Sequence, residues 1–248
     1  MATSLKKCVE QTADQATDLV ANLVKSIICD AVAQRGRCYI ALAGGTTPHA
    51  LYQRLAACGT GDDVPWMDVD IFFGDERDVP LDHVESNYNM VQRTMLDHLP
   101  LEPGHVHPMR GDADDLDAAA TEYEQTVRDL VPHGTDGMPR FDLILLGMGG
   151  DGHTASLFPN TPAVEETKKL VTANTVPVLG RRRLTFTFPL INAARNIILL
   201  VTGDDKAEAV AGLLSTDQAV RSRYPAAKLQ PTDGMLAMVF DVAASRRT

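Results

Sequence analysis

An acid and a histidine lie two residues apart in a glycine-rich turn that follows an apolar run. The run is 143–146, and the turn carries Asp151, His153 and several glycines. An imidazole titrates near neutrality and can serve as a general base. Glycines permit positive φ and let the backbone approach a ligand closely. We therefore predict that a buried strand delivers Asp151 and His153 to a cleft. The alternative is a turn histidine with a purely structural role.

The same turn spells the dinucleotide pattern G-x-G-x-x-G at Gly147, Gly149 and Gly152. That pattern binds NAD or FAD when a helix follows it and an acid ends the next strand. Prolines soon after the turn would break such a helix, and the next strand candidate, 170–174, has no carboxylate. We therefore expect neither a dinucleotide nor any other cofactor.

A second set of polar groups lies in Gly44-Gly45-Thr46-Thr47, which precedes Pro48. Thr47 suits the N-cap of a helix and Pro48 its first residue. Backbone N–H groups and hydroxyls would then converge at the positive end of the helix dipole, as a phosphate requires. An ordinary capped turn is the alternative. No Walker A lysine follows, which argues against a nucleoside triphosphate.

Three charged residues, Asp75, Glu76 and Arg77, follow the predicted strand 69–73 after one glycine, and Asn87 lies a little further on. Partial burial at the edge of a sheet makes an unpaired charge costly. We expect these groups to pair with one another or with a ligand, the alternative being a solvated salt-bridged turn.

Two cationic positions complete the set. Arg183 ends the basic run 181–183 before a predicted strand at 184–188, and a guanidinium there could bind a phosphate through two hydrogen bonds. Lys206 follows the apolar run 197–201, in the predicted first turn of a helix, where a cation opposes the dipole. It is either offset by the two preceding aspartates or held there to meet an anion, and we favour the anion.

Helical and strand-like patterns alternate along the chain. The predicted helices are 13–32, 49–57, 87–99, 116–130 and 205–214. The predicted strands are 38–43, 69–73, 143–146, 170–174, 184–188, 197–201 and 235–240. This alternation predicts an α/β fold, Rossmann-like, with a mostly parallel sheet flanked by helices on both faces. Ligands then bind at the carboxyl ends of the strands, where the polar loops above should meet.

We expect residues 1–248 to form a single domain, with 59–63 and 133–140 as surface connections. Hydrophobic content of 44% and charged content of 23% are ordinary for a globular protein. The formal charge of −10 disfavours nucleic acid or an anionic membrane as the main partner.

Metal-binding, redox and targeting signals are weak. Cysteines 8, 29, 38 and 58 form no C-x-x-C pair, so we expect reduced structural thiols. His105 and His107 lack a nearby third ligand and H-E-x-x-H is absent, so no metal is expected. No signal core and no apolar run long enough to span a bilayer occur, which predicts a cytoplasmic protein.

These segments resemble the glucosamine-6-phosphate isomerase/6-phosphogluconolactonase family, and the lactonases in particular. The family motifs are met, in family order, by G-G-T-T-P at 44–48, F-F-G-D-E-R at 72–77, S-N-Y at 86–88, L-G-M-G-G-D-G-H-T-A-S-L-F-P at 146–159, R-L-T at 183–185 and T-G-D-D-K at 202–206. Two departures are Thr46, where serine is common, and Gly150, where an acid is common. We expect both to be tolerated.

The resemblance implies hydrolysis of 6-phospho-D-glucono-1,5-lactone without metal or nucleotide. We also expect a monomer or weak homodimer. Its implied catalytic residues are His153, Asp151 and Asp75. The implied substrate-binding residues are Gly44, Gly45, Thr46, Thr47, Arg77, Asn87, Gly152, Arg183 and Lys206.

Two other functions remain open from the sequence. A glucosamine-6-phosphate deaminase also carries a D-G-H turn, although the T-A-S-L-F-P continuation and the G-D-E-R segment resemble lactonases. A non-catalytic phosphosugar-binding regulator is the second alternative, against which the presence of His153 with Asp75 and Arg77 argues.

Overall fold

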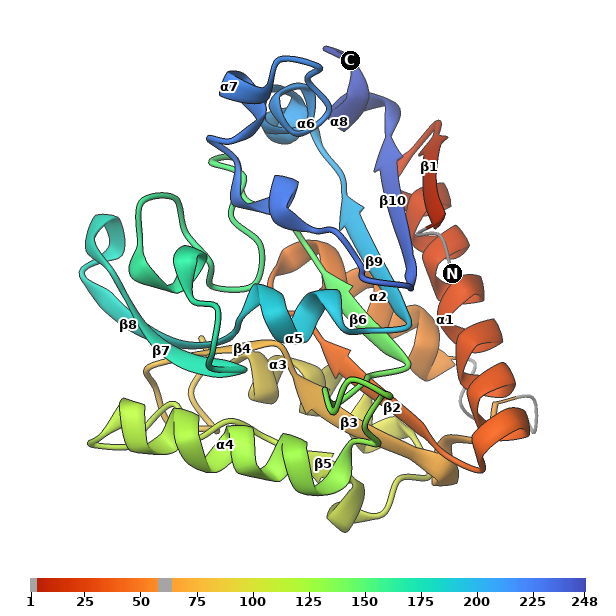
Figure 1. The fold of residues 1–248 in the computed structure, drawn as a ribbon. Helices are drawn as coiled ribbons and strands as arrows, with labels where there is room; N and C mark the ends of the chain where they lie inside the picture. The colour runs from red at the N-terminus through yellow and green to blue at the C-terminus, as the bar shows by residue number, and fades with distance from the viewer. Residues whose placement is uncertain (1–3, 58–63) are drawn as a thin grey trace.

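The computed structural model describes residues 4–57 and 64–248, and Figure 1 shows how its elements are arranged. The strands are β1 (Ser4–Glu10), β2 (Cys38–Leu42), β3 (Val69–Phe73), β4 (Asp75–Arg77), β5 (Val106–His107), β6 (Leu143–Leu146), β7 (Val171–Val176), β8 (Arg181–Phe186), β9 (Asn196–Val201) and β10 (Met235–Asp241). The α-helices are α1 (Ala13–Arg35), α2 (Thr46–Ala57), α3 (Asn87–Thr94), α4 (Leu116–Leu130), α5 (Phe188–Asn192), α6 (Ala207–Leu213), α7 (Gln218–Arg221) and α8 (Val242–Ser245).

The main sheet has seven strands in the order β1-β10-β9-β6-β2-β3-β5. Every neighbouring pair is parallel. β6 lies in the middle, and all four of its residues are buried, as expected for a strand covered on both faces. Because all strands run the same way, the loops that follow them emerge at one edge.

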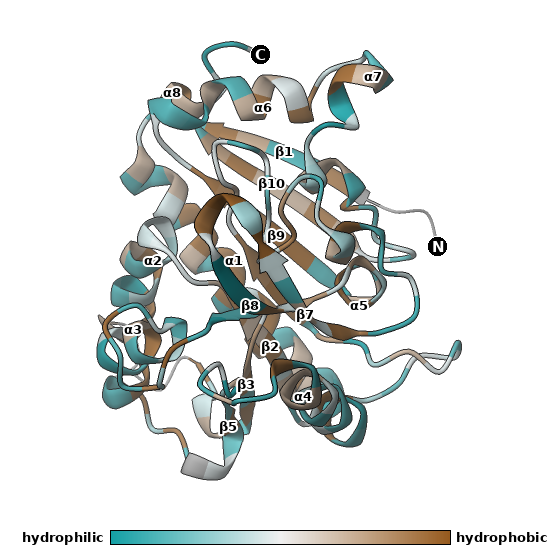
Figure 2. Ribbon diagram, turned by 90° about the vertical axis from the view of Figure 1, so that its left-hand side faces the viewer, coloured by the Kyte–Doolittle hydropathy of each residue, from teal (hydrophilic) through white to brown (hydrophobic). Residues whose placement is uncertain are grey.

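Helices cover both faces of this sheet. In Figures 1 and 2, α1, α2 and α3 lie on one side and α4 and α5 on the other. The hydropathy colours of Figure 2 place apolar residues in the strands and polar ones on the outer helical surfaces. The predicted fold class is confirmed.

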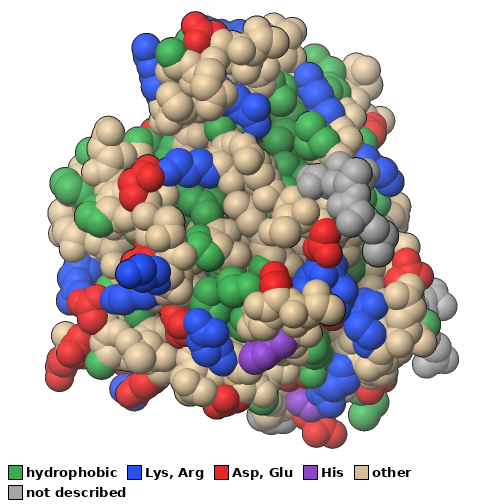
Figure 3. Space-filling view, viewed as in Figure 1, with side chains coloured by type: hydrophobic (Ala, Val, Ile, Leu, Met, Phe, Trp, Pro, Cys, Tyr) green, Lys and Arg blue, Asp and Glu red, His purple; other side chains and the backbone are tan. Residues whose placement is uncertain are grey.

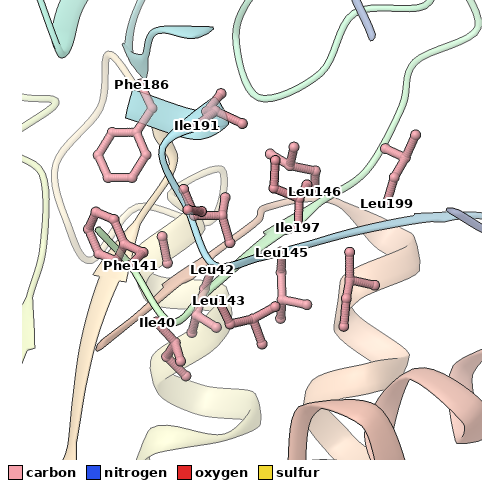
Figure 4. Close-up of a cluster of buried hydrophobic side chains, with 14 of the residues drawn as sticks. Ile40, Leu42, Phe141, Leu143, Leu145, Leu146, Phe186, Ile191, Ile197 and Leu199 are labelled. Carbon is pink, nitrogen blue, oxygen red and sulfur yellow. The ribbon is translucent and has the colours of Figure 1, made fainter. Parts of the chain in front are cut away.

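The core runs through the strands of the central sheet, where Ile40, Leu42, Leu143 and Leu145 are buried together (Figure 4). An aromatic cluster extends this core to the smaller sheet. The Phe72 and Phe141 rings meet edge to face, with centroids 5.1 Å apart, and Phe141 and Phe186 are 5.5 Å apart. Since Phe186 belongs to β8, the two sheets share one apolar core.

The predicted strands 170–174 and 184–188 exist, but they do not join the parallel sheet. As β7 and β8 they form a separate antiparallel sheet with β4, in the order β4-β8-β7. β8 begins earlier than predicted, at Arg181, and stops before the short helix that Pro189 opens. Alternation in a single strand does not reveal which partner the strand will pair with.

β1 was not predicted, because its Lys6-Lys7 pair breaks the apolar pattern. It is an edge strand that pairs with β10 alone, so it needs only partial burial.

Several helix boundaries also differ from the prediction. α1 continues to Arg35 and ends at Gly36, whose φ of 77° gives a left-handed cap. α2 begins at Thr46, so the prediction that Thr47 is the N-cap was wrong.

The predicted helix 87–99 ends as α3 at Thr94 and is followed by a 3₁₀ turn, Leu96–His98. The predicted helix 205–214 divides into a 3₁₀ turn, Asp204–Lys206, and α6. The loop predicted at 59–63 lies outside the described residues. In the described ranges no helix is both long enough and apolar enough to cross a membrane.

Candidate active site

The loops after β2, β3, β6 and β9 meet with β8 around one cleft of about 370 Å³. Nine of the twelve predicted site residues line it: Gly44, Gly45, Thr46, Thr47, Asp75, Arg77, His153, Arg183 and Lys206. Asp151, Asn87 and Gly152 do not line this cleft. They contact residues that do, as described below.

Asp151 holds the ring of His153. The Nδ1 atom of His153 lies 2.6 Å from Oδ1 of Asp151, and the same oxygen accepts the backbone N–H of His153 at 3.1 Å. An ionised carboxylate only accepts, so Nδ1 is the donor, and in the neutral imidazole Nε2 has the lone pair. Burial acts to raise the pKa of Asp151, but the hydrogen bond and charge of His153 outweigh it and hold that pKa below its ordinary value.

The turn that carries His153 is closed by its own backbone. Gly149 N–H donates to the carbonyl of His153, and Gly152 N–H donates to the carbonyl of Gly149, both at 2.9 Å. The His153 ring stacks on Phe158, with centroids 3.9 Å apart and planes 20° apart. The ring is therefore fixed on one side by a carboxylate and on one face by an aromatic ring.

Gly152 supports this turn from behind. Its φ is 77°, a conformation that favours glycine, and a Cβ there would collide with the ring of Tyr224. Its carbonyl accepts the N–H of Ala226 at 3.0 Å. Gly152 shapes the loop rather than the wall of the cleft.

Asp75 is a buried carboxylate that ties three loops together. Its Oδ2 accepts the hydroxyl of Ser156 at 2.7 Å, and its Oδ1 accepts Nδ2 of Asn87 at 3.2 Å. The Asn87 side chain in turn fills the space where a Cβ on Gly44 would lie. Asn87 therefore positions the loop after β2, and it lines a neighbouring cavity that shares Gly45, Thr46 and Arg77 with the cleft.

Glu76 points away from the cleft and is fully buried. Its carboxylate accepts the backbone N–H groups of Arg77, Asn87 and Tyr88 and the hydroxyl of Ser86, at 2.7–3.0 Å. Burial raises the pKa of Glu76, and these donors oppose the rise. Glu76 therefore holds the start of α3 in place. This charged group is paired, as predicted, and its partners are groups of the protein instead of a ligand.

Arg77 and Arg183 are direct cross-strand partners in the antiparallel pair β4 and β8. Like charges placed opposite each other are unfavourable unless an anion lies between them. Burial lowers the pKa of Arg183, and repulsion from Arg77 lowers it further. Asp78 offsets part of this charge, with its Oδ1 3.1 Å from Nη1 of Arg183.

The other two arginines of the basic run face elsewhere. Arg182 contacts Asp117 on α4 at 3.1 Å. Arg181 lies 3.5 Å from Asp78 and 3.6 Å from Glu85. Of the three, Arg183 is the one that lines the cleft, which is the choice the sequence favoured.

Lys206 also lines the cleft, at the end of the 3₁₀ turn after β9. Its Nζ lies 3.0 Å from Oδ2 of Asp205, so an aspartate does offset its charge. Beside it, the hydroxyls of Thr47 and Thr202 are 3.4 Å apart and join the loops after β2 and β9. Arg77, Arg183, Lys206 and the imidazole of His153 thus line one cleft.

Basic side chains do not dominate the face of the molecule shown in Figure 3. On the face shown in Figure 3, Lys and Arg lie interspersed with Asp and Glu. The cations that line the cleft are therefore a local feature of a protein whose formal charge is −10.

No cluster of three or more metal-ligating side chains occurs within the described ranges. His107 instead pairs with Asp70 at 2.9 Å and packs on Phe72. The described cysteines, Cys8, Cys29 and Cys38, are free thiols, and burial raises the pKa of Cys38.

Three contributors to the site escaped the sequence analysis: Ser156, Phe158 and Thr202. Ser156 and Phe158 belong to the T-A-S-L-F-P motif, so the motif marked the segment without showing which residues face inward. Thr202 could be assigned to the site only once the order of the strands in the sheet was known.

The fold and site define a parallel α/β protein with a cleft at the carboxyl ends of its strands, where cationic side chains lie in the same cavity as a histidine held by an aspartate. The model of the family "Glucosamine-6-phosphate isomerases/6-phosphogluconolactonase" matches residues 11–238. The chain belongs to this family.

Individual proteins show which members of the family this chain is similar to. The chain is 41% identical over 221 residues to the 6-phosphogluconolactonase of Synechocystis sp., covering 89% of both chains. The 6-phosphogluconolactonase structure from Trypanosoma brucei superposes with a TM-score of 0.84 at 28% identity, covering 99% of both chains. A monomeric glucosamine-6-phosphate deaminase shares the fold, with a TM-score of 0.81 at 23% identity over 99% of this chain and all of that one.

Proposed function

We propose that this protein hydrolyses 6-phospho-D-glucono-1,5-lactone to 6-phospho-D-gluconate, the second step of the oxidative pentose phosphate pathway. The observation that carries the proposal is the shared cleft: His153, held by Asp151, lines the same cavity as Arg183, Lys206 and the loop 44–47. Lactonases of 37–43% identity to this chain support the choice of reaction.

The phosphate would bind to Gly45, Thr46, Thr47, Arg183 and Lys206. The N-terminus of α2 supplies backbone N–H groups there, and the two cations supply charge. Arg77 stands opposite Arg183 and would complete the polar wall. Binding at this end leaves the sugar ring to extend toward His153.

In this mechanism Nε2 of His153 removes a proton from water as the water attacks the lactone carbonyl. The resulting imidazolium then protonates the departing ring oxygen. Asp151 holds the ring and stabilises the imidazolium. A δ-lactone is already reactive, so positioning and base catalysis suffice without a covalent nucleophile.

The oxyanion that forms on the carbonyl needs hydrogen-bond donors. The N–H groups of Gly149 and Gly152 already donate inside the turn. Other backbone N–H groups of the glycine-rich loops would have to donate to the oxyanion. Asp75, buried beside Ser156, would orient the sugar hydroxyls or the loop itself.

A pH-stat assay on freshly generated lactone tests the reaction, with spontaneous hydrolysis as the internal baseline. We expect acid release well above that baseline, unchanged by a metal chelator. No acceleration would overturn the proposal. Binding of the phosphosugar without turnover would indicate a regulator instead.

The deaminase with the same fold keeps a second candidate in view. Release of ammonia from glucosamine 6-phosphate would favour that activity. The D-E-R segment and the residues after His153 favour the lactonase.

The remaining predictions about the whole protein are also proposals. A single domain is supported by the core that both sheets share. The monomeric or weakly dimeric state and the cytoplasmic location rest on the sequence alone.

A further inference from the structure

A second cationic cavity lies at the opposite edge of the main sheet. It has a volume of about 110 Å³ and is lined by Arg35, Arg37, Tyr39, Pro132, Arg140, Asp142 and Arg195. Arg37, Asp142 and Arg195 directly precede β2, β6 and β9, so the cavity lies at the amino ends of these strands. The candidate active site lies at their carboxyl ends, and the two cavities share no residue.

Four guanidinium groups converge on this cavity, with one lining carboxylate. Asp142 is buried, and both of its oxygens are engaged: Oδ1 by Arg35 at 2.9 Å and Arg195 at 3.3 Å, and Oδ2 by the N–H of Tyr39 at 2.9 Å. Asp142 therefore organises the arginines but does not neutralise all of them.

Two more carboxylates balance the outer arginines. Arg37 pairs with Asp70 at 2.9 Å, and Asp70 is shared with His107. Arg140 pairs with Asp233 through both guanidinium Nη atoms. Four arginines thus face three carboxylates, which leaves a positive excess in a protein whose overall charge is −10.

Arg195 provides an independent sign of a missing partner. Its Nε atom is buried and makes no hydrogen bond to any described residue, because its contact with Asp142 lacks hydrogen-bond geometry. A buried donor without an acceptor costs free energy. Burial lowers the pKa of Arg195, and repulsion from Arg140 and Arg35 lowers it further. An anion in the cavity would relieve the repulsion among these guanidinium groups.

We propose that this arginine cavity is a second anion site, which binds a phosphate group at the amino edge of the sheet, remote from the catalytic cleft. Planar guanidinium groups match the oxygens of a phosphate through paired hydrogen bonds. The cavity has under a third of the volume of the cleft, so it takes the phosphate group and leaves any attached organic part in solvent.

Inorganic phosphate titrated into the ¹⁵N-labelled full chain tests the site, with ionic strength held constant by chloride. Backbone amide shifts of Tyr39 and Asn196 report on the arginine cavity, and those of Thr47 and Thr202 report on the cleft. We expect saturable shifts of Tyr39 and Asn196. Arg195→Gln should weaken that binding at least tenfold and leave the Thr47 and Thr202 responses unchanged.

Arg223→Gln, which removes the same charge from an exposed position, is the matched control and should bind as the wild type does. If Arg195→Gln fails to fold, Arg195→Lys keeps the charge near Asp142 but loses the planar fork, and it should still weaken binding severalfold. No shift at Tyr39 and Asn196 in the wild type, or equal affinity in the Arg195 variants, would overturn the proposal.

Glycerol phosphate in a parallel titration distinguishes the source of the phosphate group. Binding of both compounds with similar affinity would identify the phosphate end of a metabolite as a ligand. Binding of inorganic phosphate alone would identify the free ion.

Discussion

The hydroxyl of Ser156 donates a 2.7 Å hydrogen bond to the buried carboxylate of Asp75, across 81 positions of the chain. This bond joins the loop after β3 to the loop that carries His153. The same carboxylate accepts the amide of Asn87, which packs against Gly44. The position of the candidate base therefore depends on a carboxylate that lies on another strand end.

Ser156→Ala should lower the free energy of unfolding by about 1–3 kcal/mol, because Asp75 loses a donor in a buried setting. Turnover should fall as well, since the His153 loop loses its tie to β4. Urea denaturation and the pH-stat assay measure the two effects. Ser222→Ala, at an exposed position, is the control, and equal stability of the two variants would contradict the role given to the bond.

His153→Ala should fold normally and bind the phosphosugar, yet lose about 10²–10⁴-fold in kcat through loss of the general base. Circular dichroism, product-inhibition constants and the lactone assay separate these properties. His133→Ala changes an exposed histidine outside the cleft and should keep full activity. Near-wild-type turnover of the His153 variant would refute the assigned base.

Asp151→Asn tests the pH dependence that the lowered pKa of Asp151 implies. A carboxyl with a folded pKa below its unfolded value of about 3.9 stabilises the fold above that value, and loses this contribution as the pH falls through the folded pKa. The difference in unfolding free energy between wild type and variant should be present at about pH 5 and shrink as the pH falls through the folded pKa of Asp151.

Asp151 is partly exposed, so screening keeps this difference below about 1 kcal/mol. Paired denaturant titrations at neutral and acid pH measure it. A difference that grows in acid would mean that the carboxylate does not gain from its contact with His153.

Arg183→Gln should raise KM about 10- to 100-fold, because a charge-assisted hydrogen bond to the phosphate contributes about 1.5–3 kcal/mol. Arg182→Gln is the matched neighbour. Arg182 contacts Asp117 outside the cleft, so this variant should keep KM within about twofold of wild type. Equal KM values for the two variants would show that Arg183 does not hold the substrate.

Gly152→Ala should destabilise the protein more than Gly180→Ala. Both glycines have positive φ, at 77° and 59°, but a Cβ at Gly152 would collide with Tyr224 whereas nothing lies within 4 Å at Gly180. Gly152→Ala should lower the free energy of unfolding by about 1–3 kcal/mol more than Gly180→Ala does, because a tightly packed turn must shift. Thermal unfolding of both variants gives the comparison, and equal midpoints would argue against this role of Tyr224.

The strongest local patterns predicted their elements closely. The run 143–146 is the central strand β6, and 69–73 is β3 with the predicted bounds. The short motifs also indicated that 44–47, His153 and Lys206 belong to one site, since parallel strands bring their carboxyl ends together. Arg183 reaches the same cleft from the separate antiparallel sheet. Boundaries failed where a side chain had competing local options, as with Thr47, which is inside α2 instead of capping it.

The amino-acid sequence by itself determined which segments become buried strands and which loops carry acid, base and anion-binding chemistry, because periodicity and residue type are local properties. Only the tertiary structure decided that β7 and β8 pair with β4 in a sheet of their own, that Arg183 rather than Arg182 faces the cleft, and that Asn87 and Gly152 act from behind the site. Strand partners, facing directions and buried neighbours depend on contacts between residues far apart in the chain, which no local pattern encodes.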